Sequence, residues 1–141
     1  MTNVPKARDV MVSPVITISQ SLSIYKAIDI LIENEISGAP VLDDSGKLIG
    51  MISEKDCLKV LSKGVNHALP KEGEPVSAFM TKGVETIPPD MDIFFIAGIF
   101  LRNYYRRLPV VENGKLIGQV SRVNLLKGIR KYIVEKYHID K

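Results

Sequence analysis

The chain contains two copies of one sequence unit, and this repeat constrains the fold more than any other feature. Its clearest sign is the segment Lys47–Asp56, which returns as Lys115–Asn124. The alignment covers residues 10–59 and 79–127, with one additional residue, Ser45, in the first copy, and 17 of the 49 aligned pairs are identical. A solenoid is excluded, because such arrays need shorter units and at least three of them. The repeat therefore predicts two similar halves with paired, equivalent surfaces.

Each copy has the pattern of a strand, a helix, two strands and a second helix. Runs rich in β-branched residues indicate the strands, and apolar residues at helical spacing after a serine indicate the helices. In the first copy we expect strands at 15–18, 39–42 and 47–53, a helix from Ser21 or Ser23 to about Asn34, and a helix at 54–62. The second copy repeats this order, with a hairpin turn at Asn113-Gly114 and a last helix from Val123 to His138. The sequence therefore predicts an α+β (α/β) fold of two pseudo-symmetric repeats.

Several short motifs occur in the same order in both copies. They are the opening Asp9-Val10-Met11, the apolar strands Ala39–Leu42 and Leu108–Val111, and the segments Gly-x-x-Ser-x-x-Asp from Gly50 and Gly-x-x-Ser-x-x-Asn from Gly118. With these residues the chain resembles the CBS domain family, whose members carry two copies in tandem as a Bateman module. The resemblance implies a stand-alone pair of repeats packed sheet to sheet. We divide the chain into residues 1–62, the first repeat with a lead-in that forms a short helix at Ala7–Met11, a linker at 63–75, and the second repeat with its C-terminal helix at 76–141.

Composition indicates a mixed surface and no catalytic centre. The 141 residues carry 19 basic and 16 acidic side chains, so a nucleic-acid binder, which would carry a basic stripe, is disfavoured. One cysteine, Cys57, excludes an internal disulfide and reads as a small buried residue, and the two distant histidines lack metal-ligand spacing. The start has no signal-peptide pattern, and the longest apolar run is too short to span a bilayer. We expect a cytoplasmic protein that is not an enzyme and needs no metal.

The segment Ser53-Glu54-Lys55-Asp56 lies where a strand ends and a helix begins, and the residues permit two interpretations. A serine followed three residues later by an acid is a capping box, which satisfies unpaired N–H groups at the start of the helix. The same helix start suits a phosphate, to which Ser53 could donate, and the two oxygens of Asp56 could accept both hydroxyls of a ribose. The residues alone favour the capping box, and both interpretations stay open.

The resemblance favours the second interpretation. In the CBS family this serine or threonine and the aspartate contact the phosphate and ribose of adenosine ligands in the cleft between repeats. It implies that Ser53 and Asp56 bind AMP, ADP or ATP, with S-adenosylmethionine and NADH as further possibilities. The equivalent residues of the second copy are Ser121 and Asn124. Because an amide offers one acceptor oxygen and no charge, we predict unequal sites, with that of Asp56 the stronger.

Further candidates come from the positions beside these motifs. Arg106 and Arg107 match a family position where basic side chains reach the phosphates, although a plain surface pair is the alternative. The equivalent residues of the first copy are Ser37 and Gly38, the latter without a side chain that would keep a ligand ring from the backbone. Since each site in the family draws on both copies, the resemblance adds three candidates for the lining of the Asp56 site, namely Thr81, Lys82 and Tyr105.

The helix at Ile93–Leu101 is apolar on all sides, and such a helix must be covered on all sides. One side can face the core of the module. We expect a second copy of the chain to cover the other, as Bateman modules commonly pair through these helices; the alternative is that the lead-in or the C-terminal helix covers it within the monomer.

These observations lead to one preferred function and two alternatives. We expect a homodimeric regulatory module that binds an adenosine-containing ligand and passes a change of conformation to an unidentified partner protein. The first alternative is a dimerisation or docking module that binds no ligand, in which Ser53 and Asp56 only cap a helix. A nucleic-acid binder, whose retention on DNA or RNA would depend steeply on salt, is a distant third.

Overall fold

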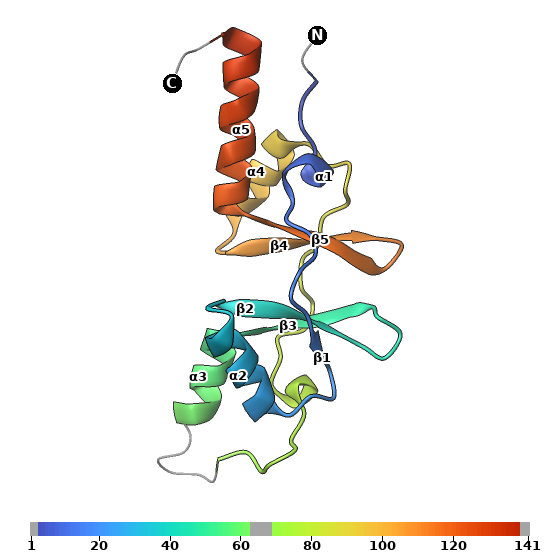
Figure 1. Ribbon diagram of the computed structural model, residues 1–141, viewed down its shortest axis with the longest axis vertical. Coiled ribbons are helices and arrows are strands. Elements are labelled where there is room, and N and C mark those ends of the chain that lie inside the picture. The colour runs from blue at the N-terminus through green and yellow to red at the C-terminus, as the bar shows by residue number, and fades with distance from the viewer. Residues whose placement is uncertain (1–2, 63–68, 139–141) are drawn as a thin grey trace. The chain divides into compact units, whose positions relative to one another are not determined.

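The computed structural model describes residues 3–62 and 69–138, which form two compact units. The first-repeat unit comprises residues 16–84, and the second-repeat unit comprises residues 1–15 together with 85–141. The elements, in chain order, are α1 (Ala7–Val10), β1 (Ile18–Ser19), α2 (Ile24–Glu33), β2 (Gly38–Leu42), β3 (Leu48–Ser53), α3 (Glu54–Ser62), the 3-10 helix η2 (Val76–Ala78), α4 (Ile93–Arg102), β4 (Arg107–Glu112), β5 (Lys115–Ser121) and α5 (Arg122–Tyr137). The first copy shows the predicted order of strand, helix, two strands and helix, and the mixture of helices and strands in both copies confirms the α+β fold class (Figure 1).

The first-repeat unit is a three-stranded sheet with two helices on one side (Figure 1). β1 pairs in parallel with β2, and β2 pairs antiparallel with β3. Ser23 caps α2 by accepting a hydrogen bond from the Tyr25 N–H at 3.3 Å, as the sequence predicts. Residues from the strands and from α2 form one buried core, which includes Ile18, Ile24, Leu31, Val41 and Ile52. β2 lies between β1 and β3 and is buried along most of its length.

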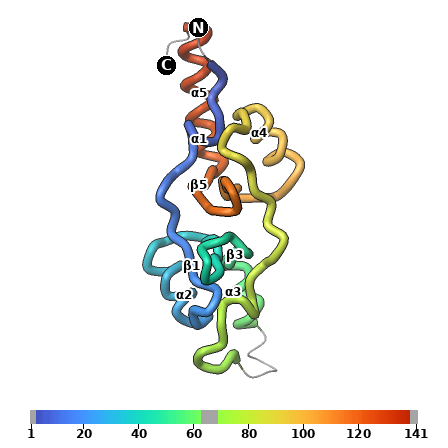
Figure 2. The backbone as a smooth tube through the Cα atoms, turned by 90° about the vertical axis from the view of Figure 1, so that its right-hand side faces the viewer, coloured from blue at the N-terminus to red at the C-terminus, as the bar shows by residue number. Residues whose placement is uncertain are grey.

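The second-repeat unit is the β4–β5 hairpin, covered by α4 and α5, with the N-terminal α1 packed beside α5 (Figure 2). Its core contains Ile93, Ile96 and Ile99 of α4, together with Leu108 and Val120 of the hairpin. Asp92 caps α4 by accepting from the Phe95 N–H at 2.9 Å. The two units therefore share an antiparallel hairpin packed against two helices.

The first strand of each copy is shorter than the sequence predicts. Residues 15–17 lie outside the sheet, and only Ile18 and Ser19 form β1. In the second copy the equivalent segment is a single parallel bridge between Ile87 and Val110. The two copies differ in the length of this strand for a simple reason. In the first copy the Gln20 N–H donates to Leu42 O at 2.9 Å, whereas the equivalent residue of the second copy is Pro89, which has no N–H to donate.

The two hairpin turns are built differently, as the additional residue Ser45 in the first copy requires. There the Asp43 carboxylate accepts from the N–H groups of Ser45 and Lys47, both at 2.9 Å, and from the Ser45 hydroxyl. Hydrogen bonds, above all that from Ser45, lower the pKa of Asp43. In the second copy Asn113 and Gly114 both have positive φ, of 54° and 80°, as the predicted Asn-Gly turn requires.

Each repeat receives its opening segment from the other copy. Met11, in the lead-in, packs against Gly118, and Val12 forms a backbone bridge with Gln119, so the lead-in belongs to the second-repeat unit. The equivalent Met80 packs against Gly50 in the first-repeat unit. Val10 and Met11 point inward as predicted, but into the core of the second repeat. The two spatial units, residues 16–84 and residues 1–15 with 85–141, therefore differ from the sequence repeats, which divide the chain into residues 1–62 and 76–141.

Residues 3–62 and 69–138 include no helix with both the length and the apolar content that crossing a lipid bilayer requires.

Candidate functional site

Three side chains meet at the start of α3, where β3 ends. The Asp56 carboxylate accepts three hydrogen bonds: from the Ser53 N–H at 3.0 Å and the Ser53 hydroxyl at 2.9 Å, both on Oδ2, and from the Thr81 hydroxyl at 3.1 Å on Oδ1. In return the Asp56 N–H donates to Ser53 Oγ at 3.2 Å. Asp56 is 9% exposed, and it is the buried charged residue of the described chain. We call these residues, Ser53, Asp56 and Thr81, the Asp56 cluster.

Thr81 reaches the cluster because its backbone is paired with β3. The Met51 N–H donates to Thr81 O at 2.9 Å, and the Thr81 N–H donates to Met51 O at 2.8 Å. The pairing leaves little room at Gly50, since a Cβ atom there would lie 2.7 Å from Met80 Sδ and 2.8 Å from Thr81 O. Thr81 therefore lies beside Asp56, and a glycine at position 50 permits this close approach.

Ser37 and Gly38 lie next to the Asp56 cluster at the start of β2. Gly38 stands opposite Ser53 in the β2–β3 register, and Ser37 O accepts from the Glu54 N–H at 2.8 Å. Two of the first three N–H groups of α3, those of Glu54 and Asp56, are therefore already bound within the chain. A phosphate at this helix start would meet fewer free N–H groups than an uncapped helix offers.

The geometry confirms the capping box and leaves acceptor capacity on Asp56. The reciprocal bonds between Ser53 and Asp56 satisfy donors at the start of α3, as the capping interpretation requires. A carboxylate has about four lone-pair sites, and only three are used here, one of them on Oδ1. Oδ1 can therefore accept a further hydroxyl. The two interpretations of the sequence are compatible, because one carboxylate can cap the helix and still accept from a ligand.

The equivalent cluster of the second repeat has one partner fewer. Ser121 and Asn124 form the same reciprocal pair, with the Ser121 N–H donating to Asn124 Oδ1 at 3.0 Å and the Asn124 N–H donating to Ser121 Oγ at 3.1 Å. The residue that aligns with Thr81 is Val12, which makes the same backbone bridge, to Gln119, but has no hydroxyl. The two helix starts therefore differ by a charge and by a hydroxyl.

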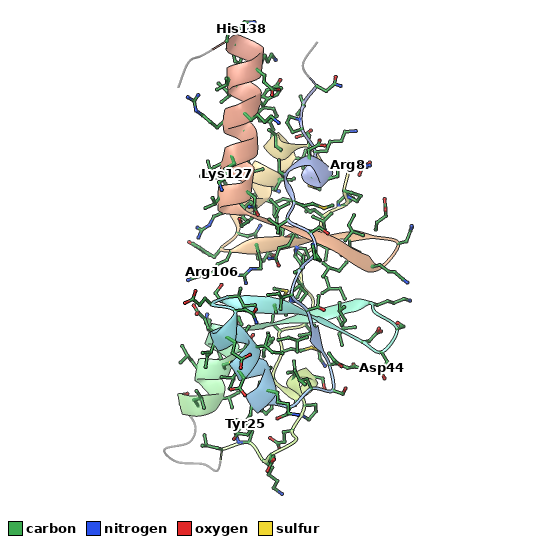
Figure 3. The ribbon with its side chains drawn as sticks, viewed as in Figure 1. Arg8, Tyr25, Asp44, Arg106, Lys127 and His138 are labelled. Carbon is green, nitrogen blue, oxygen red and sulfur yellow. The ribbon has the colours of Figure 1, made fainter. Side chains whose placement is uncertain are left out.

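The remaining candidates lie in two places. Arg107 stands opposite Ser121 in the β4–β5 register, which brings it to the start of α5, and Arg106 is exposed just before it (Figure 3). Tyr105 donates to the Glu85 carboxylate, and this hydrogen bond raises the pKa of its phenol. Lys82 is exposed and follows Thr81 directly. Arg107 thus lies near Ser121 and Asn124, and Lys82 lies near the Asp56 cluster.

Cys57 follows Asp56 on the inner face of α3 and is 6% exposed. Burial, and secondarily the Asp56 carboxylate, raises the pKa of its thiol. Since the thiolate is the reactive form, we predict that iodoacetamide at about pH 8 alkylates the native protein at least about tenfold more slowly than the urea-unfolded protein. Equal rates, measured by mass spectrometry over time, would contradict the buried position of the thiol.

Sequence reasoning overlooked how the opening segments determine the difference between the clusters. Val12 and Thr81 are aligned, so the signal was available, but it requires knowing that each of these residues pairs with the strand of the other copy. Thr81 and Asp56 are 25 positions apart in the sequence, and only the tertiary structure brings them into contact.

Comparison with known proteins identifies the repeat. The family model described as CBS domain matches residues 7–63 and 76–131, that is, both copies. The uncharacterized protein MJ1225 of Methanocaldococcus jannaschii is 30% identical over 120 residues, which cover 85% of this chain and 41% of that protein. The chain thus spans less than half the length of this relative.

Two solved structures contain bound adenosine compounds. The structure of CBSX2 in complex with AMP matches with a TM-score of 0.78 and 28% identity over 90% of this chain and 97% of that one. A second matching structure is that of the CBS-pair protein CBSX2 from Arabidopsis thaliana. The CBS domain pair of MJ0100, in complex with 5-methylthioadenosine and S-adenosyl-L-methionine, matches with a TM-score of 0.76 and 25% identity over 92% and 98%. With both copies matched by the family model, the chain belongs to the CBS domain family as a tandem pair of repeats.

Proposed function

We propose that this CBS pair is a regulatory module that binds an adenosine-containing ligand at the Asp56 cluster, with AMP, ADP or ATP the preferred class. The supporting observation is the free acceptor capacity of the Asp56 carboxylate beside the Ser53 and Thr81 hydroxyls. Similar CBS pairs contain AMP, or methylthioadenosine and S-adenosylmethionine. Binding needs no covalent step, because a ligand regulates simply by binding one of two conformations more tightly.

Within the Asp56 cluster each side chain would have a separate role. The Asp56 carboxylate would accept from a ribose hydroxyl on Oδ1, which now accepts only from Thr81. The hydroxyls of Ser53 and Thr81 can rotate, so that either one donates to a phosphate oxygen once the ribose replaces it on the carboxylate. Lys82, exposed beside Thr81, would supply the positive charge that a phosphate favours.

At the second cluster the same ligand would bind more weakly through its ribose. Asn124 Oδ1 already accepts from the Ser121 N–H, and the amide offers no second acceptor oxygen. Arg107, which stands opposite Ser121, and its neighbour Arg106 suit phosphate oxygens. Phosphate recognition would therefore dominate there, and ribose recognition would dominate at Asp56.

A calorimetric titration tests the ligand directly. The wild-type protein is titrated in separate experiments with AMP, ADP, ATP, S-adenosylmethionine and NADH, and we expect heat from at least one of the three nucleotides, with two unequal sites or a single occupied one. Two equal, independent sites would contradict the difference between Asp56 and Asn124. If none of the five compounds gives heat, the alternative, a dimerisation or docking module without a ligand, replaces this proposal.

The exposed part of α4 supports a dimer as a second part of this proposal. Of the apolar helix α4, Ile93, Ile96 and Ile99 are buried within the second-repeat unit. Phe94 meets Tyr132 of α5 edge to face, with ring centroids 5.7 Å apart, so the C-terminal helix covers part of the remaining face. Phe95 and Leu101 are nevertheless 63% and 88% exposed. We propose that a second copy of the chain covers this part of α4.

The dimer predicts the behaviour of a polar substitution on α4. Sedimentation velocity of the wild type should show a dimer at micromolar concentration, and the variant Phe95→Ser with Leu101→Ser should dissociate at least about tenfold more readily, because both side chains lose buried apolar area. Ile16→Ser, which replaces an exposed apolar residue outside the helices, should leave the dimer intact and serves as the matched control. A wild-type protein that sediments as a monomer would contradict the dimer.

A further inference from the structure

The Asp56 carboxylate cannot accept both hydroxyls of a ribose and also keep all of its present hydrogen bonds. A carboxylate offers about four lone-pair sites, and three are occupied: two on Oδ2 by the N–H and the hydroxyl of Ser53, and one on Oδ1 by the hydroxyl of Thr81. One site is free, whereas the two hydroxyls of a ribose require two. A ribose that donates both hydroxyls to Asp56 therefore displaces one of the present donors.

Thr81 is the donor that can leave. Both groups of Ser53 belong to the capping box, in which Ser53 Oγ also accepts from the Asp56 N–H at 3.2 Å, so their release would open the start of α3. The Thr81 side chain is exposed, and within residues 3–62 and 69–138 its one hydrogen bond is that to Asp56 Oδ1, at 3.1 Å. The Thr81 bond is thus the one that breaks with the least loss of structure.

The displaced hydroxyl stays beside the ligand, because the backbone of Thr81 is fixed. Two hydrogen bonds with Met51, of 2.8 and 2.9 Å, hold this backbone against β3, and the preceding Met80 packs against Gly50. A hydroxyl that is covered by a ligand and has no acceptor opposes binding, since it loses the hydrogen bond that it made before. Thr81 consequently favours a ligand that brings an acceptor of its own.

A 5′-phosphate is such an acceptor, and Lys82, exposed and next in the chain, adds a positive charge. Adenosine and methylthioadenosine carry the same base and the same ribose hydroxyls as AMP, but at the 5′ position they offer a neutral hydroxyl or a thioether. A neutral hydroxyl binds a donor less strongly than an anionic oxygen does, and a thioether is a weak acceptor. The three compounds therefore differ in the group that has to accept from the released Thr81 hydroxyl.

We propose that Thr81 determines the ligand specificity of the Asp56 cluster: its hydroxyl makes the site select adenosine compounds with a 5′-phosphate over those without one. This inference rests on the proposed function and specifies the chemical group that the site requires. The second repeat supplies a natural comparison, because Val12 forms the same pair of backbone hydrogen bonds, with Gln119 at 2.8 and 3.1 Å, and has no hydroxyl. The cluster of Ser121 and Asn124 lacks this means of selection.

Calorimetric titration of the full chain with AMP and with adenosine measures the selectivity. In the wild type we expect AMP to bind at least about tenfold more tightly than adenosine. Thr81→Val, which copies the second repeat, should bind AMP at least about fivefold more weakly than the wild type and adenosine at least as tightly, so that the affinity ratio of AMP to adenosine falls at least about fivefold. Thr81→Ser, which retains the hydroxyl, should keep the ratio within about threefold of the wild-type value.

The variant Asp56→Asn separates this effect from binding at the second cluster. In that background Thr81→Val should change the affinity for AMP by less than about twofold, because the Asp56 cluster no longer accepts the ribose. If Thr81→Val leaves the affinity ratio unchanged, or if Thr81→Ser lowers it as much as Thr81→Val does, the specificity role is overturned, while AMP binding and with it the proposed function stand. Methylthioadenosine that binds the wild type as tightly as AMP would overturn the specificity role without any variant. A wild type that binds none of the three compounds overturns the proposed function and this inference together.

Discussion

Replacing Gly50 with alanine should lower the free energy of unfolding by about 1–3 kcal/mol, the usual cost of forcing an additional methyl group into a packed site. The new Cβ would lie 2.8 Å from Thr81 O, which is backbone, and 2.7 Å from Met80 Sδ. Because Thr81 is held to β3 by its two hydrogen bonds with Met51, it cannot move aside without breaking that pairing. Urea unfolding followed by circular dichroism measures the effect.

Two other glycines provide matched controls for the same chemical change. Gly118→Ala should destabilise less than Gly50→Ala, because the atoms nearest to its new methyl group, Met11 Sδ and Cγ, belong to a side chain that can move, whereas Gly50 also faces the backbone oxygen of Thr81. Gly98→Ala, within α4, should be neutral or stabilise by about 0.5–1 kcal/mol, since alanine favours a helix and the nearest atom, Arg102 Nη1 at 3.1 Å, can move. Equal unfolding free energies for all three variants would show that the opening segments do not pack as described.

The substitution Asp56→Asn should separate the capping role of this residue from its proposed role in binding. The pair of Ser121 and Asn124 shows that an amide completes the same capping box, with a bond of 3.0 Å to the serine N–H. The amide nitrogen can donate to the Thr81 hydroxyl, which reverses the present bond. We therefore expect the free energy of unfolding to change by less than about 1 kcal/mol.

The affinity for the nucleotide should respond much more strongly. With its oxygen on Ser53 and its nitrogen on Thr81, the amide leaves no acceptor for a ribose hydroxyl, and a lost hydrogen bond to a charged group corresponds to an affinity about tenfold or more lower. Calorimetry with AMP measures this loss, and Asn124→Asp, which should strengthen the second cluster, is the reciprocal control. If Asp56→Asn binds AMP as tightly as the wild type, the capping role stands and the ribose role is wrong. Asp56→Ala, in contrast, should lower the unfolding free energy by about 0.5–2 kcal/mol through loss of the cap.

Local signals in the sequence predicted the helices well because capping and turn residues mark where each one begins or ends. The serine before α2 and the acid three residues into the Ser53 motif set the positions of α2 and α3, and Asn113-Gly114 set the second hairpin. The first strands were predicted too long because β-branched residues do not ensure a partner. Residues 15–17 lie outside the sheet although their composition favours a strand, because pairing requires a partner segment that local composition does not report.

The membership of the candidate site was predicted in part. Ser53 and Asp56 follow from a motif within four residues, and the weaker second cluster follows from Asn124 at the aligned position. The reason for placing Thr81 near Asp56 was the resemblance, while the structure supplies the cause, a backbone bridge to Met51. Val12, whose missing hydroxyl adds to the difference between the clusters, was not recognised, because its relevance depends on a contact 107 positions away, with Gln119.

By itself the sequence determined the duplication, the order of elements in each copy, the two capping boxes and the inequality of Asp56 and Asn124. Only the tertiary structure decided which opening segment serves which repeat. Met11 and Met80 are identical in type, and so are the glycines that receive them, Gly118 and Gly50. Because both segments and both glycine positions are equivalent in sequence, no local signal shows which segment packs against which strand. The path of the whole chain makes the assignment, and it is this exchange that places a hydroxyl beside Asp56 and none beside Asn124.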